Sequence, residues 1–221
     1  MYKKDEFRKL DAKYNPHLYT GLLGYALRYS HRQLENFNRE KKYSKVLEIG
    51  AGDAPHLVYL EHEYDEYFIA ETSSSALEFY KGMKNVKAYS YDGMNLPFED
   101  NFFDRIIISQ CLEHVNEPEK FLFEMMGKLK KDGVLSISLP TDPGLLWRLG
   151  RLIIKYFIVR RTYNVSKEEY EYINATEHIN SIFTLINLIR YNFKNQIKEN
   201  FLPFKIKLVD LNLFYIVHIT K

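Results

Sequence analysis

The chain has 221 residues, with 31 Lys and Arg against 29 Asp and Glu and a formal net charge of +2. This length can bury a sizeable core, and the near-neutral balance provides no broad positive surface for nucleic acid. The single cysteine, Cys111, excludes an internal disulfide framework and is typical of a reducing compartment. The sequence shows neither a secretory leader nor an apolar run of membrane-spanning length, so we expect a cytoplasmic protein.

Residues 1–42 combine dense charge with apolar residues at helical spacing, which predicts one or two helices before the first strand. Residues 46–57 then read VLEIGAGDAPHL, a short apolar run, a small-residue turn and a segment with helical spacing. Gly50 and Gly52 allow a sharp bend or the close approach of a ligand, and Pro55 suits the first turn of a helix. A purely structural turn is the alternative interpretation.

Two nucleotide-binding patterns use such a turn. The dinucleotide pattern G-x-G-x-x-G needs a third glycine at position 55, where this chain has proline. The other pattern, an acidic residue followed by G-x-G-x-G, matches Glu48, Gly50 and Gly52, with Ala54 in the last position. The second pattern is therefore favoured.

Acidic residues follow the next two predicted strands. The strand over residues 67–70 stops at Glu71, whose carboxylate is placed to accept hydrogen bonds from ribose hydroxyls. The strand over residues 86–91 leads into Asp92, which can accept from an exocyclic amine, and Met94, which can pack on a purine ring. The alternatives are a helix-terminus carboxylate for Glu71 and an ordinary turn residue for Asp92.

The pattern of alternating strands and helices continues through a fourth strand at 105–109, a helix at 118–130 and a fifth strand at 134–139. Such alternation predicts a parallel sheet with right-handed crossovers. Ligands of these sheets bind beyond the carboxyl ends of the strands, where Gly50, Glu71, Asp92 and Gln110 all fall.

At this point the chain resembles the class I S-adenosylmethionine (SAM)-dependent methyltransferase family. The resemblance rests on residues 46–57, on YDGMNLPFEDNFFD at 91–104 and on SQCLEHVNEP at 109–118. It implies an α/β, Rossmann-like three-layer sandwich with a mostly parallel sheet of about seven strands, the last antiparallel. It also implies one domain over 1–221, made of an N-terminal helical cap (1–42), a SAM-binding core (43–140), a helical lid or insert (141–192) and closing strands (193–221).

The resemblance further implies S-adenosyl-L-methionine as cofactor and S-adenosylhomocysteine (SAH) as product. Its motifs place the glycine loop at the cofactor backbone, the second strand end at the ribose, the third at the adenine and the fourth at the sulfonium. The cofactor-binding residues expected on this basis are Glu48, Gly50, Ala51, Gly52, Glu71, Thr72, Asp92, Gly93, Met94, Gln110 and Cys111.

Two histidines are candidates for acid or base catalysis. His178 lies after the fifth strand, where small-molecule members of this family bring a histidine to the substrate, and a cap or core histidine is the alternative. His114, beside Glu113, is a weaker candidate because this pair often packs under the loop in the resembled family. Cys111 has no evident basic partner and is not expected to act as a nucleophile, and no metal site is expected.

Further substrate candidates come from the flanks. The segment at 145–159 is apolar and helical, with Arg148, Arg151 and Lys155 at spacings of three and four that form a cationic stripe. This stripe can bind an acidic substrate, contact an anionic membrane weakly, or simply face solvent. In the resembled family the N-terminal helical piece often covers the site, so Tyr19 and Arg28 are substrate candidates, with solvent exposure as the alternative. Ser166 and Glu169 predict a capping box.

The interpretation is a SAM-dependent methyltransferase (EC 2.1.1.-) that methylates an O or N of a small molecule. PTDPGLLWRLGR at 140–151 and TEHINSI at 176–182 resemble methyltransferases associated with bacterial surface-polysaccharide synthesis, which implies a nucleotide-linked or lipid-linked sugar as acceptor. The alternatives are a nucleotide-binding oxidoreductase, a catalytically silent SAM-binding partner subunit and a nucleotide-binding protein at a membrane surface. Nucleic acid is not an expected partner, and the oligomeric state is left open.

Overall fold

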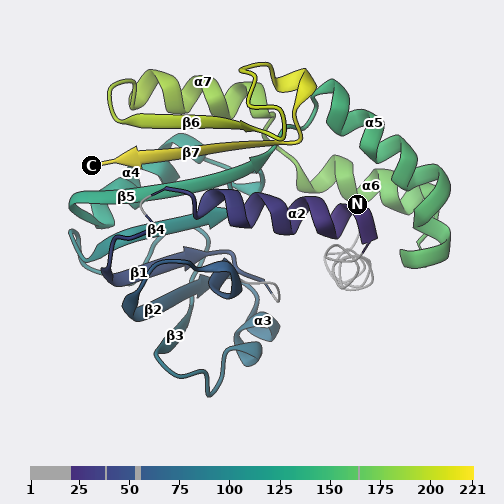
Figure 1. The fold of residues 1–221 in the computed structure, drawn as a ribbon. Helices are drawn as coiled ribbons and strands as arrows, with labels where there is room; N and C mark the ends of the chain where they lie inside the picture. The colour runs from purple at the N-terminus through teal and green to yellow at the C-terminus, as the bar shows by residue number, and fades with distance from the viewer. Residues whose placement is uncertain (1–20, 38, 53–55, 164) are drawn as a thin grey trace.

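The computed structural model describes residues 21–37, 39–52, 56–163 and 165–221. Its centre is a seven-stranded sheet with the strand order β3-β2-β1-β4-β5-β7-β6 (Figure 1). The strands are β1 (Tyr43–Ile49), β2 (Tyr64–Glu71), β3 (Val86–Ser90), β4 (Phe103–Ser109), β5 (Leu129–Pro140), β6 (Ile197–Leu202) and β7 (Phe214–Thr220).

The direction of the strands matches the predicted sheet. Strands β1 to β5 are parallel to one another, whereas β7 is antiparallel to both β5 and β6. The expected fold class, a mostly parallel sheet of about seven strands with an antiparallel last strand, is confirmed. Ile49 pairs with Ala70 on one side and with Ile108 on the other, so the ends of β1, β2 and β4 lie level.

Helices cover both faces of the sheet and produce three layers (Figure 1). The described helices are α2 (Gly21–Leu34), α3 (Ser74–Phe79), α4 (Pro118–Lys128), α5 (Leu145–Ile153), α6 (Lys167–Glu177) and α7 (Ile182–Asn192). One face of the sheet packs against α4 and α7 through buried residues such as Met125 and Ile186. The other face packs against α2 through Leu27 and Leu34.

A helical extension lies beyond the carboxyl ends of the parallel strands, at the right of Figure 1. It consists of α5, the π-helical segment η4 (Ile154–Tyr163) and α6. Segments η4 and α6 share a small core of Val159, Val165, Tyr170 and Ile173. The predicted capping box at the start of α6 is confirmed.

Within the described ranges, no helix is both long and apolar enough to cross a bilayer.

Two helical segments beside the strand ends are short. Among the described residues after β1, the chain forms the four-residue 3₁₀ turn η2 (His56–Tyr59), and the Glu48 carboxylate accepts from the backbone N–H groups of His56 and Leu57 at its start. Helix α3 has six residues and ends at Phe79. Gly82 adopts φ +81°, a left-handed conformation that an α-helix cannot continue.

A buried ionic cluster attaches α2 to the sheet. The Glu35 carboxylate lies 2.8 Å from the Arg105 guanidinium, 2.7 Å from His56 Nε2 and 2.8 Å from His62 Nδ1. Burial raises the pKa of Glu35, but the hydrogen bonds from His56 and His62 and the charge of Arg105 lower it by more than burial raises it. The pKa of Glu35 therefore lies well below its ordinary value. Glu35 therefore joins the segment after α2 to η2, to the loop before β2 and to the central strand β4.

We predict that Glu35→Gln destabilises the fold by about 3–5 kcal/mol, because Arg105 is left buried without a compensating charge. Urea unfolding followed by circular dichroism measures this loss. Glu40→Gln, at an exposed carboxylate in the following loop, is the matched control and is expected to change stability by less than about 0.5 kcal/mol. Equal stabilities of the two variants would show that the cluster does not anchor α2.

We predict that the buried His218 on β7 lowers the free energy of unfolding in acid. Burial, and next the charge of Arg105, lower the pKa of His218 to about 3. The folded state therefore keeps this side chain neutral, whereas the unfolded chain takes up a proton below its ordinary pKa of about 6.5. This preference leaves the free energy of unfolding unchanged above pH 6.5 and lowers it as the pH falls from 6.5 toward 3. At pH 5 the loss of stability amounts to about 2 kcal/mol.

Urea unfolding at several pH values between 7.5 and 5 tests this expectation. The free energy of unfolding of His218→Gln should fall less steeply with decreasing pH than that of the wild type. The difference in slope should correspond to the uptake of about one proton fewer on unfolding. Identical slopes would contradict the assignment of a neutral, buried His218.

Candidate functional site

The carboxyl ends of four parallel strands meet at one edge of the sheet. The backbone N–H of Gly52, after β1, donates to Glu71 Oε2 at the end of β2 over 2.9 Å. A Cβ atom placed on Gly93, after β3, would lie 3.7 Å from Thr72 Cγ2, and one placed on Gly50 would lie 2.6 Å from Cys111 Sγ, after β4. Residues far apart in the sequence therefore form one surface lined largely by backbone.

The glycine loop needs its glycines for different reasons. Gly50 has φ +66° and Gly52 has φ +55°, both in the left-handed region that favours glycine. Gly50 also lies against Cys111 and leaves no room for a Cβ atom, whereas none of the described residues has an atom within 4 Å of the equivalent position on Gly52. Ala51 between them is buried in the core beneath the loop.

Glu48 supports this loop from below. Its buried carboxylate accepts from the Tyr67 hydroxyl over 2.6 Å and from the His56 backbone N–H over 2.5 Å. Burial raises the pKa of Glu48, and these hydrogen bonds partly oppose the shift. The sequence predicts Glu48 as a cofactor-binding residue, but its contacts assign it a positioning role toward the loop.

Glu71 holds backbone amides on both sides of the site. Its Oε1 accepts from Thr72 N–H over 2.8 Å and from Ser73 N–H over 3.0 Å, and its Oε2 accepts from Gly52 N–H. Since a carboxylate oxygen can accept two hydrogen bonds, Oε2 retains one acceptor position. Tyr80, which the sequence places in the core, also donates its hydroxyl proton to Gly52 O and fixes the loop.

Asp92 forms a tight turn after β3. Its Oδ1 accepts from the backbone N–H groups of Met94 and Asn95, and its Oδ2 accepts from the Asn95 side-chain amide. Hydrogen bonds from Asn95, its backbone first, lower the pKa of Asp92 to about 2. This arrangement has the geometry of the predicted alternative, a turn residue, while Oδ2 keeps an acceptor position. Gly93 has φ +93°, and Met94 is half-buried beside it.

The end of β4 is held by β5. Gln110 has φ +53°, and its backbone N–H and side-chain amide donate to Ser138 O and Ser138 Oγ over 2.9 and 3.1 Å. Burial raises the pKa of the Cys111 thiol, and the carboxylates of Glu113 and Glu71 raise it further. The thiol is therefore neutral, consistent with the expectation that Cys111 is not a nucleophile.

A second group of polar residues lies beside this edge. His178 Nδ1 is 2.7 Å from Asp142 Oδ2, and Arg151 Nη1 is 3.2 Å from the same oxygen. His114 Nδ1 is 2.7 Å from Glu177 O, and the rings of His114 and His178 are 5.3 Å apart. The two predicted catalytic histidines therefore come together, although 64 positions separate them in the sequence (178 − 114).

Two members of this group were missed in the sequence. Asp142 follows β5, and the rule that selected Glu71 and Asp92 from their strand ends could have found it. Trp147 on α5 has its ring 6.4 Å from His178, and its buried indole N–H has no hydrogen-bond partner among the described residues. No sequence pattern indicated that this indole would face the histidines.

The remaining substrate candidates are more dispersed. Tyr19 lies outside the described residues, as do Ala54 and Pro55 of the glycine loop. Arg28 on α2 lies near Tyr59. Burial raises the pKa of Tyr59, and the charge of Arg28 partly opposes this shift. Arg28 thus lies toward the turn after the glycine loop.

Two of the three residues of the predicted cationic stripe, which runs over α5 and η4, form ion pairs within the protein. Arg151 pairs with Asp142, and Lys155 pairs with Glu171 over 2.8 Å, while Arg148 is exposed. The exposed side of this helical stretch is instead apolar, and we call it the α5 apolar face. It consists of Leu145, Leu149, Leu152, Ile153, Tyr156 and Phe157.

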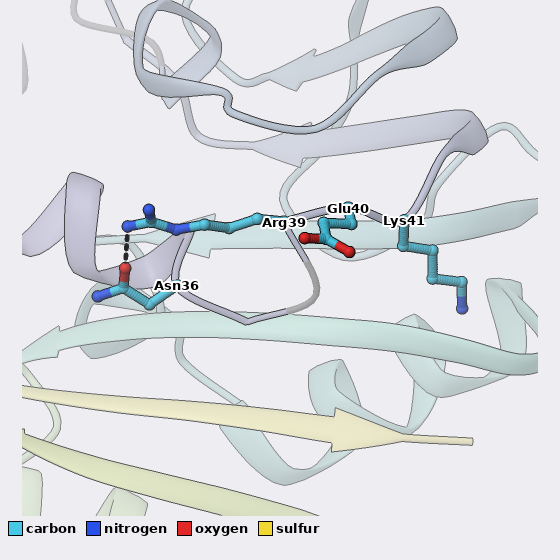
Figure 2. Close-up of a pocket in the computed structure, with 4 residues that line it drawn as sticks. All are labelled: Asn36, Arg39, Glu40 and Lys41. Carbon is cyan, nitrogen blue, oxygen red and sulfur yellow. Dashed lines mark hydrogen bonds between the residues drawn. The ribbon is translucent and has the colours of Figure 1, made fainter.

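A shallow depression lies elsewhere, between α2 and β1 (Figure 2). It is lined by Asn36, Arg39, Glu40 and Lys41. Because these residues precede β1, they lie at the amino ends of the parallel strands, opposite to the converging strand ends. We therefore assign it no part in the candidate site.

We predict that Gly50→Ala destabilises the protein by more than Gly52→Ala, because only the first variant adds a clash with Cys111 to the backbone strain. The strain costs about 1–3 kcal/mol at each position, and the clash adds about 1–3 kcal/mol at Gly50. Urea unfolding measures both losses. Adding Cys111→Ala to Gly50→Ala should restore part of the stability, and an unchanged double variant would contradict the contact.

Comparison with known sequences is consistent with this geometry. Residues 47–137 match the family described as a methyltransferase domain. The demethylmenaquinone methyltransferase of Staphylococcus haemolyticus is 32% identical over 145 residues, which are 60% of this chain and 60% of that protein. That of Staphylococcus aureus (strain Newman) is 38% identical over 99 residues, covering 42% of this chain and 41% of the relative. The chain thus spans about 60% of the first relative's length, and these relatives do not support the expected association with polysaccharide synthesis.

Solved structures agree on the fold. A SAM-dependent methyltransferase of Thermotoga maritima, described as a possible histamine N-methyltransferase, has a TM-score of 0.65 at 20% identity, covering 97% of this chain and 98% of that chain. The plantazolicin methyltransferase BpumL in complex with SAH has a TM-score of 0.68 at 16% identity, covering 100% and 92%. The chain therefore has the fold of SAM-dependent methyltransferases, and its residues 47–137 match the methyltransferase-domain family.

Proposed function

We propose that the protein is a SAM-dependent methyltransferase acting on a small molecule. The observation that carries this proposal is the meeting of four strand ends around a glycine loop whose Gly50 leaves no space for a side chain. The matched methyltransferase domain and the shared fold support it. A nucleotide-binding oxidoreductase has no support from these comparisons.

The cofactor is proposed to lie across these strand ends. The backbone of the glycine loop and of Gln110 and Cys111 would follow its methionyl part. Glu71 Oε2, with its remaining acceptor position, would bind a ribose hydroxyl, and Asp92 Oδ2 would accept from the adenine amine over Met94. Thr72 and Gly93 would close the gap between ribose and base.

The methyl group of SAM is electrophilic because it is bound to a sulfonium, so the protein must mainly align the acceptor and exclude water. The acceptor would attack the methyl carbon with an electron pair, a lone pair on O or N or the π electrons of an electron-rich ring carbon, while the electrons of the carbon–sulfur bond would remain on sulfur. Where the acceptor carries a proton, the group around His114 and His178 lies on the side to receive it. His178 is the first candidate, because Asp142 fixes its Nδ1 and leaves Nε2 available.

We propose a lipophilic acceptor that resembles demethylmenaquinone more than a sugar. The matched relatives carry the name demethylmenaquinone methyltransferase. The α5 apolar face supports the same class, because an exposed helix face of this kind can rest on a lipid surface that holds such a compound. A nucleotide-linked or lipid-linked sugar is the competing acceptor class.

We predict that Glu71→Gln weakens SAH binding by about 1–3 kcal/mol, because a neutral amide replaces the carboxylate that accepts from the ribose. Titration calorimetry measures the affinity. Glu66→Gln, at a half-buried carboxylate on the same strand that pairs with Lys87, is the matched control and should bind SAH like the wild type.

Glu71 also holds the loop, so a second comparison separates contact from scaffolding. Two analogues of SAH, one without the 2′ hydroxyl and one without the 3′ hydroxyl, are compared with SAH itself. One of the two should bind the wild-type protein more weakly than SAH does, because it lacks the hydroxyl that Glu71 contacts. That analogue should lose much less affinity with Glu71→Gln, because the paired group is already missing. Equal losses in both proteins would show that Glu71 acts only on the loop.

We predict that labelled SAM transfers its methyl group to demethylmenaquinone that has been reduced to its hydroquinone form and is presented in lipid vesicles, because only the reduced ring is electron-rich enough to attack the methyl group. Leu149→Ser combined with Ile153→Ser should reduce this turnover several-fold without changing SAH affinity, since both residues belong to the α5 apolar face. Thin-layer chromatography of the extracted lipid measures the product. The exposed Phe183→Ser on α7 serves as control.

The other outcomes of this assay separate the alternatives. Label on nucleotide-linked or lipid-linked sugars, with none on the quinone, would restore the sugar acceptor. SAH binding without transfer to any acceptor of either class would favour the silent partner subunit. Absence of SAH binding would refute the proposed function itself.

A further inference from the structure

Three side chains beside the proposed cofactor site have the composition of a metal site. Glu113 and His114 follow β4 in the 3₁₀ turn η3 (Leu112–His114), and His178 caps the carboxyl end of α6. One ligand atom from each residue lies within 4.8 Å of the other two. Two segments distant in the sequence therefore bring two imidazoles and one carboxylate close together.

The hydrogen bonds of both imidazoles leave a metal-binding nitrogen available. A carbonyl oxygen can only accept, so His114 Nδ1 must donate its proton to Glu177 O over 2.7 Å. His178 Nδ1 likewise donates to the Asp142 carboxylate over 2.7 Å. Each ring then carries its lone pair on Nε2, and histidines that bind metals through one nitrogen typically donate from the other in this way.

A separate observation points to a missing cation. The Glu113 side chain is 4% exposed, and its Oε2 is buried without a hydrogen-bond donor among the described residues. Its other oxygen, Oε1, lies 3.8 Å from His114 Nε2, too far for a hydrogen bond. A buried carboxylate oxygen without a donor is costly, and a bound cation would remove that cost.

We propose that Glu113, His114 and His178 bind one divalent transition-metal ion through a carboxylate oxygen and two Nε2 atoms. Two imidazoles and one carboxylate suit Mn²⁺, Fe²⁺, Co²⁺ or Zn²⁺ better than Mg²⁺ or Ca²⁺, which prefer oxygen ligands. Ligand atoms around such an ion lie about 3–3.5 Å apart, so the three side chains need to approach by about 1 Å.

The location gives the ion a role that rests on the proposed function. Cys111 precedes the turn η3 that carries Glu113, and its Sγ lies 2.6 Å from where a Cβ atom on Gly50 of the glycine loop would be. The ion would thus lie on the acceptor side of the proposed sulfonium position. With three protein ligands it keeps open positions for an acceptor oxygen, whose bound proton is released to solvent more easily. His178 then acts as a ligand that Asp142 orients, in place of a general base.

The test measures metal binding directly on protein that has been stripped with a chelator and carries no histidine tag. Visible absorption during Co²⁺ titration and calorimetry with Zn²⁺ should each give one site per chain. His114→Ala, His178→Ala and Glu113→Gln should each weaken binding at least tenfold. Glu117→Gln, at an exposed carboxylate nearby, should leave binding unchanged.

Circular dichroism and SAH calorimetry accompany every variant. His114 is exposed, so its variant should fold and keep the test valid even where Glu113→Gln is unstable. No stoichiometric binding to the wild type, or binding that His114→Ala and His178→Ala leave unchanged, would overturn the inference. If SAH still binds in that case, the proposed function stands, whereas metal binding without SAH binding would refute the proposed function alone.

Discussion

The buried Glu35 carboxylate is the contact on which the arrangement of this molecule depends. It pairs with Arg105 on the central strand and with His56 and His62 on either side of the turn after the glycine loop. One charge thus fixes α2 against the sheet and fixes the far end of the loop at the same time. A buried charge tolerates little displacement, because any loss of a partner leaves an uncompensated ion in the interior.

The glycine loop is built on this anchor by a second buried carboxylate. Glu48 accepts from the first two backbone N–H groups of η2, which have no partner within the turn. It thereby fixes the start of η2 relative to β1, at whose end Gly50 and Gly52 lie. From above, Glu71 and Tyr80 hold Gly52 by its N–H and its carbonyl. A site lined by backbone is in this way kept rigid before any ligand binds.

The acceptor side is organised by different means. Asp142 follows β5 and holds His178, while the carbonyl of Glu177 holds His114. Both contacts orient a histidine by its Nδ1, so the two Nε2 atoms are presented to the same region as the Glu113 carboxylate. The α5 apolar face lies on the same helical extension, which brings a lipophilic surface and a polar cluster together beside the strand ends.

The sequence by itself determined the alternation of strands and helices, the strand ends at Gly50, Glu71, Asp92 and Gln110, and the capping box at Ser166. These features are local, because hydrophobic period, glycine conformation and cap chemistry act within a few residues. Only the tertiary structure decided that Arg105 is buried against Glu35, that Arg151 on α5 and Lys155 on η4 pair with acidic residues, and that His114 lies beside His178. Those outcomes depend on partners from other segments, and no local pattern records which charge will find which partner when the chain folds.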